Sequence, residues 1–377
     1  MTMQSSYWET HRELFTTDLL VVGSGFTGLC AGRFARDTSQ SMRIAVVDQQ
    51  RYGQSLASTR NAGFACFGSP TEILYDINHE GAEQAFSRVQ RRYEGIQMWL
   101  DMFPGQDFEY SADGGLEVFQ EDERHIYENA LDHLSLLNQE FRRHINRQEV
   151  FSEGKGISQA LPLAINIAGE AGLHPGKLHS CLMESVRNEG IQIISGISIP
   201  PPSEWIKEKG LWHIPTASGL ILAEYVLLSN NAGLSELDDD TVPGRGQVIL
   251  TEPFNHGLPS GTYHAREGYM YFRTLGKRIL LGGGRDAFRE QEESLIPLGT
   301  EDVKQYLQNY LTTHICPGQV VSLDQHWAGV MAFSKRHGKS LLVKNIDEKV
   351  LTVGRMGGMG VAIAPKAAQD AIHQLLS

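Results

Sequence analysis

A strand, a glycine-rich turn and a helix near the start of the chain restrict the fold more than any other feature. Residues 18–23 (DLLVVG) form an uninterrupted apolar run, which is typical of a strand buried on both faces of a parallel sheet. The turn that follows has the pattern GxGxxG over residues 23–28, and helical composition continues to residue 37. Residues 43–48 (RIAVVD) repeat the buried-strand pattern. We therefore expect a βαβ unit that opens a doubly wound, Rossmann-like sheet.

The glycines and the acid of this unit have the spacing of a dinucleotide site. Gly23 permits a sharp turn, Gly25 has no Cβ to hold off a pyrophosphate, and Gly28 lets the helix pack closely on the sheet. The helix N-terminus offers unpaired N–H groups and partial positive charge to the phosphates. Asp48 ends the second strand, where a carboxylate accepts hydrogen bonds from an adenosine ribose. This acid disfavours the 2′-phosphate of NADP, and the motif alone leaves both FAD and NAD open.

Beyond residue 75 the pattern is foreign to a parallel sheet. Apolar residues at helical spacing predict helices over 82–100 and 127–145, and residues 108–119 resemble a hairpin with its turn at Asp113–Gly115. We expect an α/β protein, α+β overall, in which a Rossmann-like domain built from discontinuous segments contains an inserted domain of mixed sheet and helices. The expected segments are 1–75, 151–235 and 322–377 for the nucleotide-binding domain, and 76–150 and 236–321 for the substrate domain.

Composition excludes several classes of function. Lys and Arg number 33 against 45 Asp and Glu, and the net charge of -12 argues against binding to nucleic acid or anionic membranes. The four cysteines lie far apart and the histidines show no ligand spacing, so we expect neither a disulfide framework nor a metal site. The first residues carry acids and histidine where a signal peptide needs an apolar core, and no apolar run is long enough to span a bilayer. We therefore expect a cytoplasmic protein.

Two further segments carry a resemblance to a flavoprotein family. Residues 54–64 read QSLASTRNAGF, and residues 354–360 read GRMGGMG, with Ala364-Pro365 following. Together with GSGFTG, these resemble the D-amino-acid oxidase, sarcosine oxidase and glycine oxidase family of FAD-dependent oxidoreductases. Weaker matches lie at 174–178, 231–233, 243–247 and 327–329, so the resemblance runs from about residue 15 to 370. It is strongest to the amine-oxidising branch, such as gamma-glutamylputrescine oxidase-like proteins.

The resemblance implies that FAD lies along the first crossover, with its ring system between the two domains. The loop around Asn61 would run beside the ring, Ile199 would contact the adenine side, and residues 355–361 would lie at the pyrimidine edge. Backbone N–H groups at the start of the last helix also suit the negative charge of a reduced flavin. The residues expected to bind FAD are Gly23, Ser24, Gly25, Phe26, Thr27, Gly28, Asp48, Gln49, Ser58, Thr59, Arg60, Asn61, Ala62, Gly63, Ile199, Asn231, Ala232, Gly233, Arg355, Met356, Gly357, Gly358, Met359, Gly360 and Val361.

The chain departs from the family pattern at three places. Several members attach their flavin through a cysteine shortly after the position of Trp327, but residues 328–331 here are Ala-Gly-Val-Met, so we expect non-covalent FAD. Amino-acid-oxidising members hold the substrate carboxylate with an arginine at the position of Met331. Sarcosine oxidases place a lysine that assists the reaction with oxygen where this chain has Leu280. Oxygen and another electron carrier therefore both remain open as acceptors.

The expected activity is oxidation of the C–N bond of an amine or amino acid by hydride transfer to flavin N5. An imine results, and oxygen as acceptor would give hydrogen peroxide. The catalytic candidates are Tyr269, Tyr271, Arg273 and Trp327, each of which also fits ordinary packing or a structural ion pair. Arg285 and Arg355 are further candidates to bind an acidic group. The alternatives are a dehydrogenase with a carrier other than oxygen, a non-catalytic flavin-binding redox module, and an NAD-linked dehydrogenase without flavin.

Overall fold

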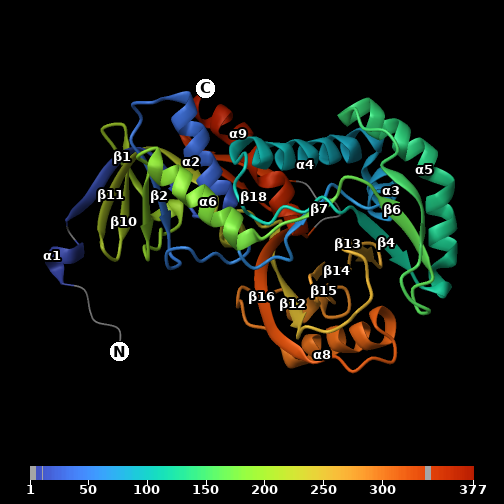
Figure 1. Cartoon of the computed structure of the whole chain (residues 1–377). Helices are drawn as coiled ribbons and strands as arrows, with labels where there is room; N and C mark the ends of the chain where they lie inside the picture. The colour runs from blue at the N-terminus through green and yellow to red at the C-terminus, as the bar shows by residue number, and fades with distance from the viewer. Residues whose placement is uncertain (1–5, 11, 336–340) are drawn as a thin grey trace.

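The first of two large β-sheets is the expected parallel sheet. The computed structural model describes residues 6–10, 12–335 and 341–377 (Figure 1). β18, β11, β1, β2 and β8 run parallel to one another, whereas β17 and β10 pair antiparallel with its members. The strand order is β17 (Leu342–Asp347), β18 (Val350–Gly354), β11 (Gly219–Leu228), β1 (Glu13–Val22), β2 (Ile44–Asp48) and β8 (Gln192–Ser195), with β10 (Leu211–Thr216) and β9 (Ile206–Glu208) continuing from β11.

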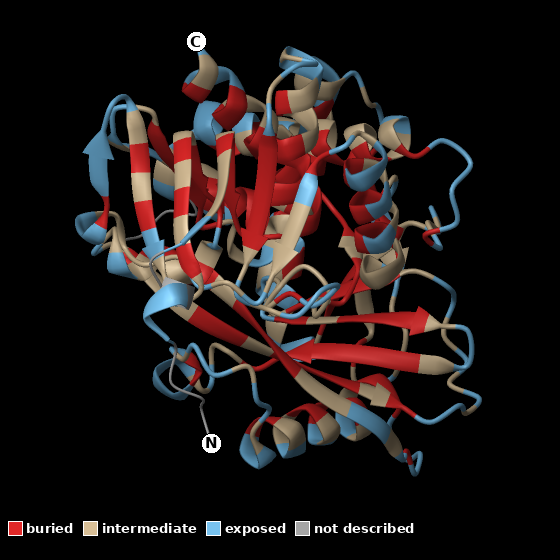
Figure 2. Cartoon of the chain, turned by 90° about the vertical axis from the view of Figure 1, so that its left-hand side faces the viewer, coloured by how far each residue is buried: buried red, intermediate tan, exposed pale blue. Residues whose placement is uncertain are grey.

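Alternate residues of these strands face two different layers. Leu19 and Val21 of β1 pack with the helices α2 (Phe26–Thr38), α6 (Pro175–Asn188) and α9 (Gly360–Leu376). Leu20 and Val22 face the opposite core, which contains residues of β10 and β11. Both faces of β18, of β2 up to Val47 and of the second half of β1 are therefore buried, and this explains their uninterrupted apolar sequences (Figure 2).

The second sheet is mainly antiparallel and has the helix α8 (Glu301–Tyr310) on one face. Val303 and Leu307 of α8 pack with Ile249, Phe272 and Leu281 of the sheet. The strand order is β16 (Leu323–Ser334), β12 (Thr241–Thr251), β15 (Arg278–Gly283), β14 (Met270–Leu275), β13 (Thr262–Ala265), β4 (Gly115–Phe119), β6 (Leu163–Ile167) and β5 (Phe151–Lys155).

Helices and a short sheet connect the two large sheets. Trp99 of α4 donates a hydrogen bond to the carbonyl oxygen of Val361 in α9 at 2.7 Å. Figure 1 shows α4 running from the first sheet toward α5. The remaining elements are α1 (Tyr7–Thr10), α3 (Pro70–Glu80), α4 (Ala82–Met102), α5 (Arg124–Ile145), α7 (Arg289–Glu292), β3 (Phe64–Ala65), β7 (Ala171–Gly172), the 3-10 turns η1 (Glu121–Glu123), η2 (Pro202–Glu204), η3 (Asn231–Glu236) and η5 (Gly357–Met359), and the π-helical turn η4 (Leu311–Ile315).

Two parts of the structure differ from the sequence expectations. Residues 108–119 do not form a hairpin, because Ser111 bridges to Gly172 and β4 pairs with β6 and β13. β5, β6 and β16 belong to the second sheet, although the expected boundaries place 151–235 and 322–377 with the nucleotide-binding domain. The physical reason is that periodicity shows which face of a strand is buried, but not which sheet the strand joins.

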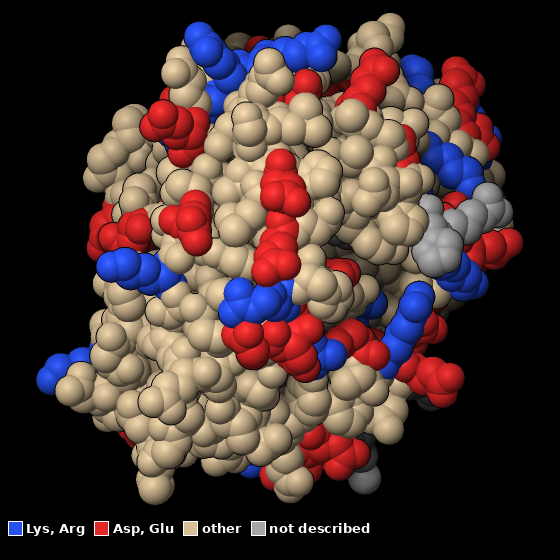
Figure 3. Space-filling model, turned by 90° about the vertical axis from the view of Figure 1, so that its right-hand side faces the viewer, with Lys and Arg blue, Asp and Glu red and all other residues tan. Residues whose placement is uncertain are grey.

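The surface carries charges of both signs. Figure 3 shows acidic and basic side chains interspersed on one face of the molecule. Within the described ranges, no helix combines the length and the apolar character that crossing a bilayer requires.

Candidate functional site

The turn after β1 requires glycine for two physical reasons. Gly23 has φ +109°, which L side chains rarely adopt, and a Cβ there would lie 3.0 Å from the carbonyl oxygen of Ser229. A Cβ on Gly28 would overlap the carbonyl oxygen of Gly23 and would lie 2.7 Å from Ser229 Oγ. The turn therefore packs directly on the end of β11, and α2 begins at Phe26 with its N-terminus at the pocket.

Asp48 fastens this turn to the end of β2. Its Oδ2 accepts hydrogen bonds from the backbone N–H of Ser24 at 2.6 Å and from Ser24 Oγ at 2.9 Å, and its Oδ1 accepts from the N–H of Gln50 at 2.7 Å. Each carboxylate oxygen has two acceptor sites, so capacity remains for a ribose hydroxyl. The carboxylate thus shapes the turn and lines the pocket at the same time.

His179 supports the same turn, although it is not among the site residues expected from the sequence. Its Nε2 lies 2.8 Å from the carbonyl oxygen of Ser24, and because a carbonyl only accepts, this nitrogen carries the proton. Burial lowers the pKa of His179, which favours the neutral ring. The sequence signal was a histidine in the helix after an HPG segment, which is too weak to indicate this contact.

One elongated pocket runs from this turn to the start of α9. Of the expected cofactor residues, those that line it are Gly23, Gly25, Phe26, Thr27, Asp48, Gln49, Ser58, Asn61, Ile199, Asn231, Ala232, Met356, Gly357, Gly358, Gly360 and Val361. Those outside the lining are Ser24, Gly28, Thr59, Arg60, Ala62, Gly63, Gly233, Arg355 and Met359. Further lining residues, which are not among the expected cofactor residues, are Val22, Val47, Gln50, Ser55, Leu56, Ala57, Ile197, Ser198, Ser229, Asn230, Val330, Met331 and Ala364.

The loop after β2 is held in shape by its own polar side chains. Asn61 donates from Nδ2 to the carbonyl oxygens of Ala57 and Ser58, at 3.2 and 2.8 Å, and its Oδ1 accepts from the N–H of Gly63 at 2.8 Å. Ser58 Oγ accepts from the N–H of Phe26 at 3.0 Å, which joins the loop to the start of α2. The pattern Ser-x-Arg-Asn-x-Gly is thus a self-bonded loop against the pocket.

The strand β16 is bonded to this loop. Trp327 donates from Nε1 to the carbonyl oxygen of Arg60 at 3.0 Å, and Arg60 donates to the carbonyl oxygen of Ala328 at 2.8 Å. The N–H of Val330 donates to the carbonyl oxygen of Leu56 at 2.7 Å. Trp327 therefore holds the loop by its indole N–H and is not among the pocket-lining residues.

The other three catalytic candidates lie on or beside β14. Tyr269 precedes the strand and is 45% exposed, whereas Tyr271 packs across Phe64 with ring centroids 5.9 Å apart. Arg273 is buried and donates from Nη1 to the carbonyl oxygens of Gly63 and Leu173, at 2.7 and 2.8 Å. None of the three lines the pocket within the described chain, and their catalytic roles stay predictions.

Three glycines, Gly244, Gly246 and Gly282, lie on the face of the second sheet that is turned toward the pocket, and we call them the glycine floor. Residues directly opposite one another share a face, so Gly244 lies with Met331, and Gly282 with Tyr271. A Cβ on Gly282 would overlap the Tyr271 ring, and one on Gly246 would lie 2.7 Å from Met331 Cε and 3.7 Å from Tyr271 Oη. These large side chains therefore lie low over the sheet, and Met331 is shared between this floor and the pocket.

The turn between β18 and α9 uses Arg355 for structure. Arg355 has φ +60°, its N–H donates to Asn231 Oδ1 at 3.1 Å, and its guanidinium pairs with Asp240 at 2.6 Å and Asp238 at 3.3 Å. The adjoining Met356, Gly357 and Gly358 line the pocket, while Arg355 itself does not.

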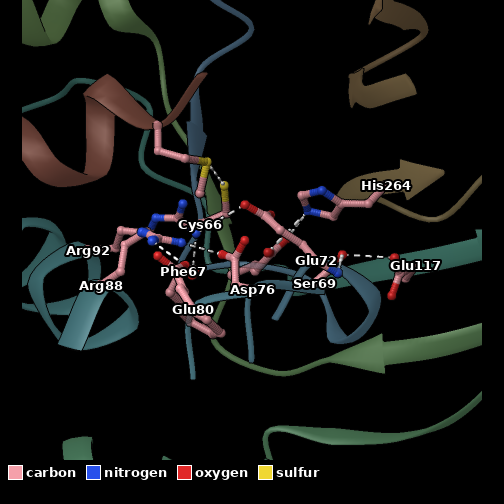
Figure 4. A network of polar contacts seen from close by, with 12 residues as sticks. Cys66, Phe67, Ser69, Glu72, Asp76, Glu80, Arg88, Arg92, Glu117 and His264 are labelled. Atoms are coloured by element: carbon pink, nitrogen blue, oxygen red, sulfur yellow. Dashed lines mark hydrogen bonds and ion pairs between the residues drawn. The ribbon is translucent and has the colours of Figure 1, made fainter. Parts of the chain in front are cut away.

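A buried polar network lies behind the loop, next to β3 (Figure 4). Glu170, which is fully buried, accepts from His264 Nε2 and from Thr262 Oγ1, both at 2.8 Å. Burial by itself lowers the pKa of His264, but the carboxylate of Glu170 more than offsets this and the pKa rises to about 9. Burial raises the pKa of Glu117 to about 7, against the opposing hydrogen bonds from Thr71 and Ser69.

Cys66 lies in the same network. Its Sγ, a carboxylate oxygen of Glu170 and a ring nitrogen of His264 lie within 4.8 Å of one another, the spacing of a metal-ligand set. Burial, with the carboxylates of Glu170 and Glu72 nearby, raises the pKa of the Cys66 thiol, which favours the neutral thiol in this structure. The ion pair between Glu170 and His264 accounts for the cluster without a cation, and the expectation of no metal stays a prediction.

The lining fits FAD by chemistry. Glycines and a helix N-terminus suit a pyrophosphate, Asp48 suits a ribose, and the glycine turn before α9 suits the anionic edge of a reduced flavin. The described lining includes none of the four cysteines, and non-covalent attachment of the FAD stays a prediction.

Comparisons with known proteins agree with this geometry. A family model described as DAO, FAD dependent oxidoreductase, matches residues 18–373. Gamma-glutamylputrescine oxidoreductase of Escherichia coli (strain K12) is 25% identical over 309 residues, which are 74% of this chain and 66%, slightly under two thirds, of that protein.

Solved structures show the same fold. Glycine oxidase from Geobacillus kaustophilus has a TM-score of 0.73 at 16% identity, over 95% of each chain. L-alpha-glycerophosphate oxidase from Mycoplasma pneumoniae with FAD bound has a TM-score of 0.71 at 17% identity, over 97% of this chain and 96% of that one. The expected fold class, family and FAD cofactor are confirmed. With a family model that covers nearly its whole length, the chain belongs to the DAO family of FAD dependent oxidoreductases.

Proposed function

We propose that this FAD enzyme oxidises the C–N bond of a small amine or amino acid. The observation that carries the proposal is the glycine floor formed by Gly244, Gly246 and Gly282 beside the flavin pocket, with Met331 common to both. A redox module without a substrate needs no open space over the sheet face next to its flavin. The glycines therefore favour an enzyme with a substrate chamber, by which we mean the space over Gly244, Gly246 and Gly282 beside Tyr271, Met331 and Phe333.

The reaction removes a hydride, which is one proton with two electrons, from the carbon next to nitrogen. Bound FAD supplies the acceptor for this hydride equivalent. The amine also loses its N–H proton, which gives an imine, and water then hydrolyses the imine to a carbonyl compound and a released amine or ammonia. The two electrons finally pass, with two protons, to oxygen, which gives hydrogen peroxide, or the electrons pass to another carrier.

The side chains of the chamber orient the substrate without supplying a base. Burial raises the pKa of Tyr271 to about 12, so its hydroxyl stays protonated and can donate a hydrogen bond to the substrate. Met331 and Phe333 present apolar surface on the same face of β16. The amine therefore enters as the neutral base or gives its proton to water.

The residue at position 280 bears on which electron acceptor the enzyme uses. Leu280 stands where sarcosine oxidases have a lysine near the flavin, and here it packs in an apolar cluster with Ala62 and Val248. No cation assists oxygen from that position. We therefore keep a carrier-linked dehydrogenase as the second candidate.

Anaerobic reduction of the flavin tests the function directly, because bleaching reports a substrate whatever the acceptor. The purified holoenzyme is mixed with primary amines, N-methyl amino acids, D- and L-amino acids and, as a control class, hydroxy acids. Reduction by one of the nitrogen compounds supports the proposal. Reduction by hydroxy acids alone, or by none of the compounds, contradicts it. Readmitting oxygen or a dye to the reduced enzyme then separates oxidase from dehydrogenase.

A further inference from the structure

The three arginines considered for binding an acidic substrate group have different surroundings. Arg273 is bonded to two backbone carbonyls, and Arg355 is paired with Asp238 and Asp240. Arg285, two residues after the end of β15, instead lies over the ring of Phe333, with Cζ 3.8 Å from the ring centroid. Its guanidinium therefore rests on the chamber side of β16.

Arg285 has no carboxylate partner among the residues that the structure describes. The adjacent Asp286 pairs with Arg266 at 2.7 Å instead. The Arg285 side chain is partly buried, and this burial lowers its pKa from the ordinary value. A partly desolvated guanidinium without a counter-ion is the arrangement that an anionic ligand completes.

The surroundings of Arg285 connect it to the flavin site. A Cβ on Gly244 would overlap the Phe333 ring and would lie 3.7 Å from Arg285 Cδ, so both side chains lie directly over this glycine. A Cβ on Gly357, which lines the flavin pocket, would lie 3.8 Å from Phe333. Phe333 thus lies close to both the Arg285 guanidinium and the flavin turn.

We propose that Arg285 binds a carboxylate or other oxyanion of the substrate, and that the substrate is an amine whose anionic group reaches the Phe333 end of the chamber. The inference rests on the proposed function. Met331 can make no ion pair with a carboxylate. The anion is therefore held by Arg285 over Phe333, two residues further along β16. The site therefore favours an amine whose acidic group is separated by several bonds from the carbon that is oxidised.

Two probe compounds separate charge recognition from amine oxidation. The anionic probe is 4-(methylamino)butanoate, and the neutral one is N-methylbutylamine, which has a similar chain without the carboxylate. For Arg285→Met, we expect the ratio of the flavin reduction rate to the dissociation constant to fall about 100-fold with the anionic probe and less than about threefold with the neutral one. Arg285→Lys should recover part of the loss, because a point charge replaces a bidentate one.

A binding measurement without turnover distinguishes the two proposals. Butanoate is titrated into oxidised holoenzyme, and its binding is followed through the flavin spectrum and by calorimetry. We expect wild type and the exposed neighbour control Arg289→Met to bind it, and Arg285→Met to lose binding while it retains FAD and its melting temperature. If butanoate binds through Arg285 but no amine reduces the flavin, the proposed function fails and the anion site stands.

The anion site is contradicted by either of two results. One is equal loss for both probes in Arg285→Met. The other is undiminished butanoate binding and undiminished reduction by the anionic probe in that variant.

Discussion

Arg273 offers the sharpest test of how the structure assigns side chains around the flavin loop. Its buried guanidinium donates from Nη1 to Gly63 at 2.7 Å and to Leu173 at 2.8 Å, and the N–H of Leu173 donates to Gly63 at 2.8 Å. The side chain therefore fixes the end of the loop that contains Asn61 to the segment after β7. We expect Arg273→Met to destabilise the protein and to weaken FAD binding, because Asn61 lines the pocket.

The size of the effect follows from the two hydrogen bonds. A hydrogen bond with a charged partner contributes about 1.5–3 kcal/mol net of the water it replaces, and both bonds come from the same Nη1 atom. We therefore expect a loss of about 2–4 kcal/mol in the free energy of unfolding, between the value for one such bond and that for two.

Urea unfolding at saturating FAD, followed by tryptophan fluorescence, measures the loss. The control is Arg278→Met on β15, since Arg278 pairs at 2.6 Å with Asp324 and both side chains are about one third exposed. Such a pair contributes about 1 kcal/mol or less. An Arg273→Met protein with unchanged stability and FAD affinity, but defective reduction by substrate, would refute the structural assignment and support the catalytic role.

Three further perturbations follow from the site. The pKa of His264 is about 9 in the folded protein and about 6.5 in the unfolded chain, so its pairing with Glu170 stabilises the protein fully below pH 6.5, and this stability is lost as pH rises through 9. The melting temperature, measured against pH, should therefore decline over this range, and His264→Gln should flatten the decline. Parallel curves for the wild type and the variant would contradict this prediction. Gly28→Ala should abolish FAD binding, because the new Cβ overlaps the Gly23 carbonyl oxygen; flavin content checks this, and normal content would show that the turn can move. Met331→Arg should gain flavin reduction by glycine or D-alanine, and absence of any gain with FAD intact would contradict the proposed loss of a carboxylate clamp.

The parts that the sequence predicted are those with local physical causes. The turn from Gly23 to Gly28 needs glycine because backbone atoms approach it directly, and Asp48 is positioned by the strand that it ends. The parallel strands could be recognised because both of their faces are buried. Such features leave the same residues at the same spacing in any chain that binds a dinucleotide in this way.

The parts that the sequence could not predict depend on distant contacts. Nothing near Arg273 in the chain indicates that its partners are Gly63 and Leu173, and the catalytic candidates were chosen by motif position alone. The membership of β5 and β6 in the second sheet likewise depends on pairing with β4. The sequence offers Arg273, Arg285 and Arg355 alike, and only their partners in the folded chain distinguish Arg285 from the other two.

The flavin content of the purified protein tests the central claim most directly. The protein is denatured by heat, precipitate and supernatant are separated, and the flavin in each is identified by chromatography and fluorescence. The account predicts FAD in the supernatant in proportion to protein, and none attached to the precipitate. Flavin retained by the precipitate would contradict non-covalent binding, and absence of flavin from both fractions, with no FAD taken up by the apoprotein, would contradict the account as a whole.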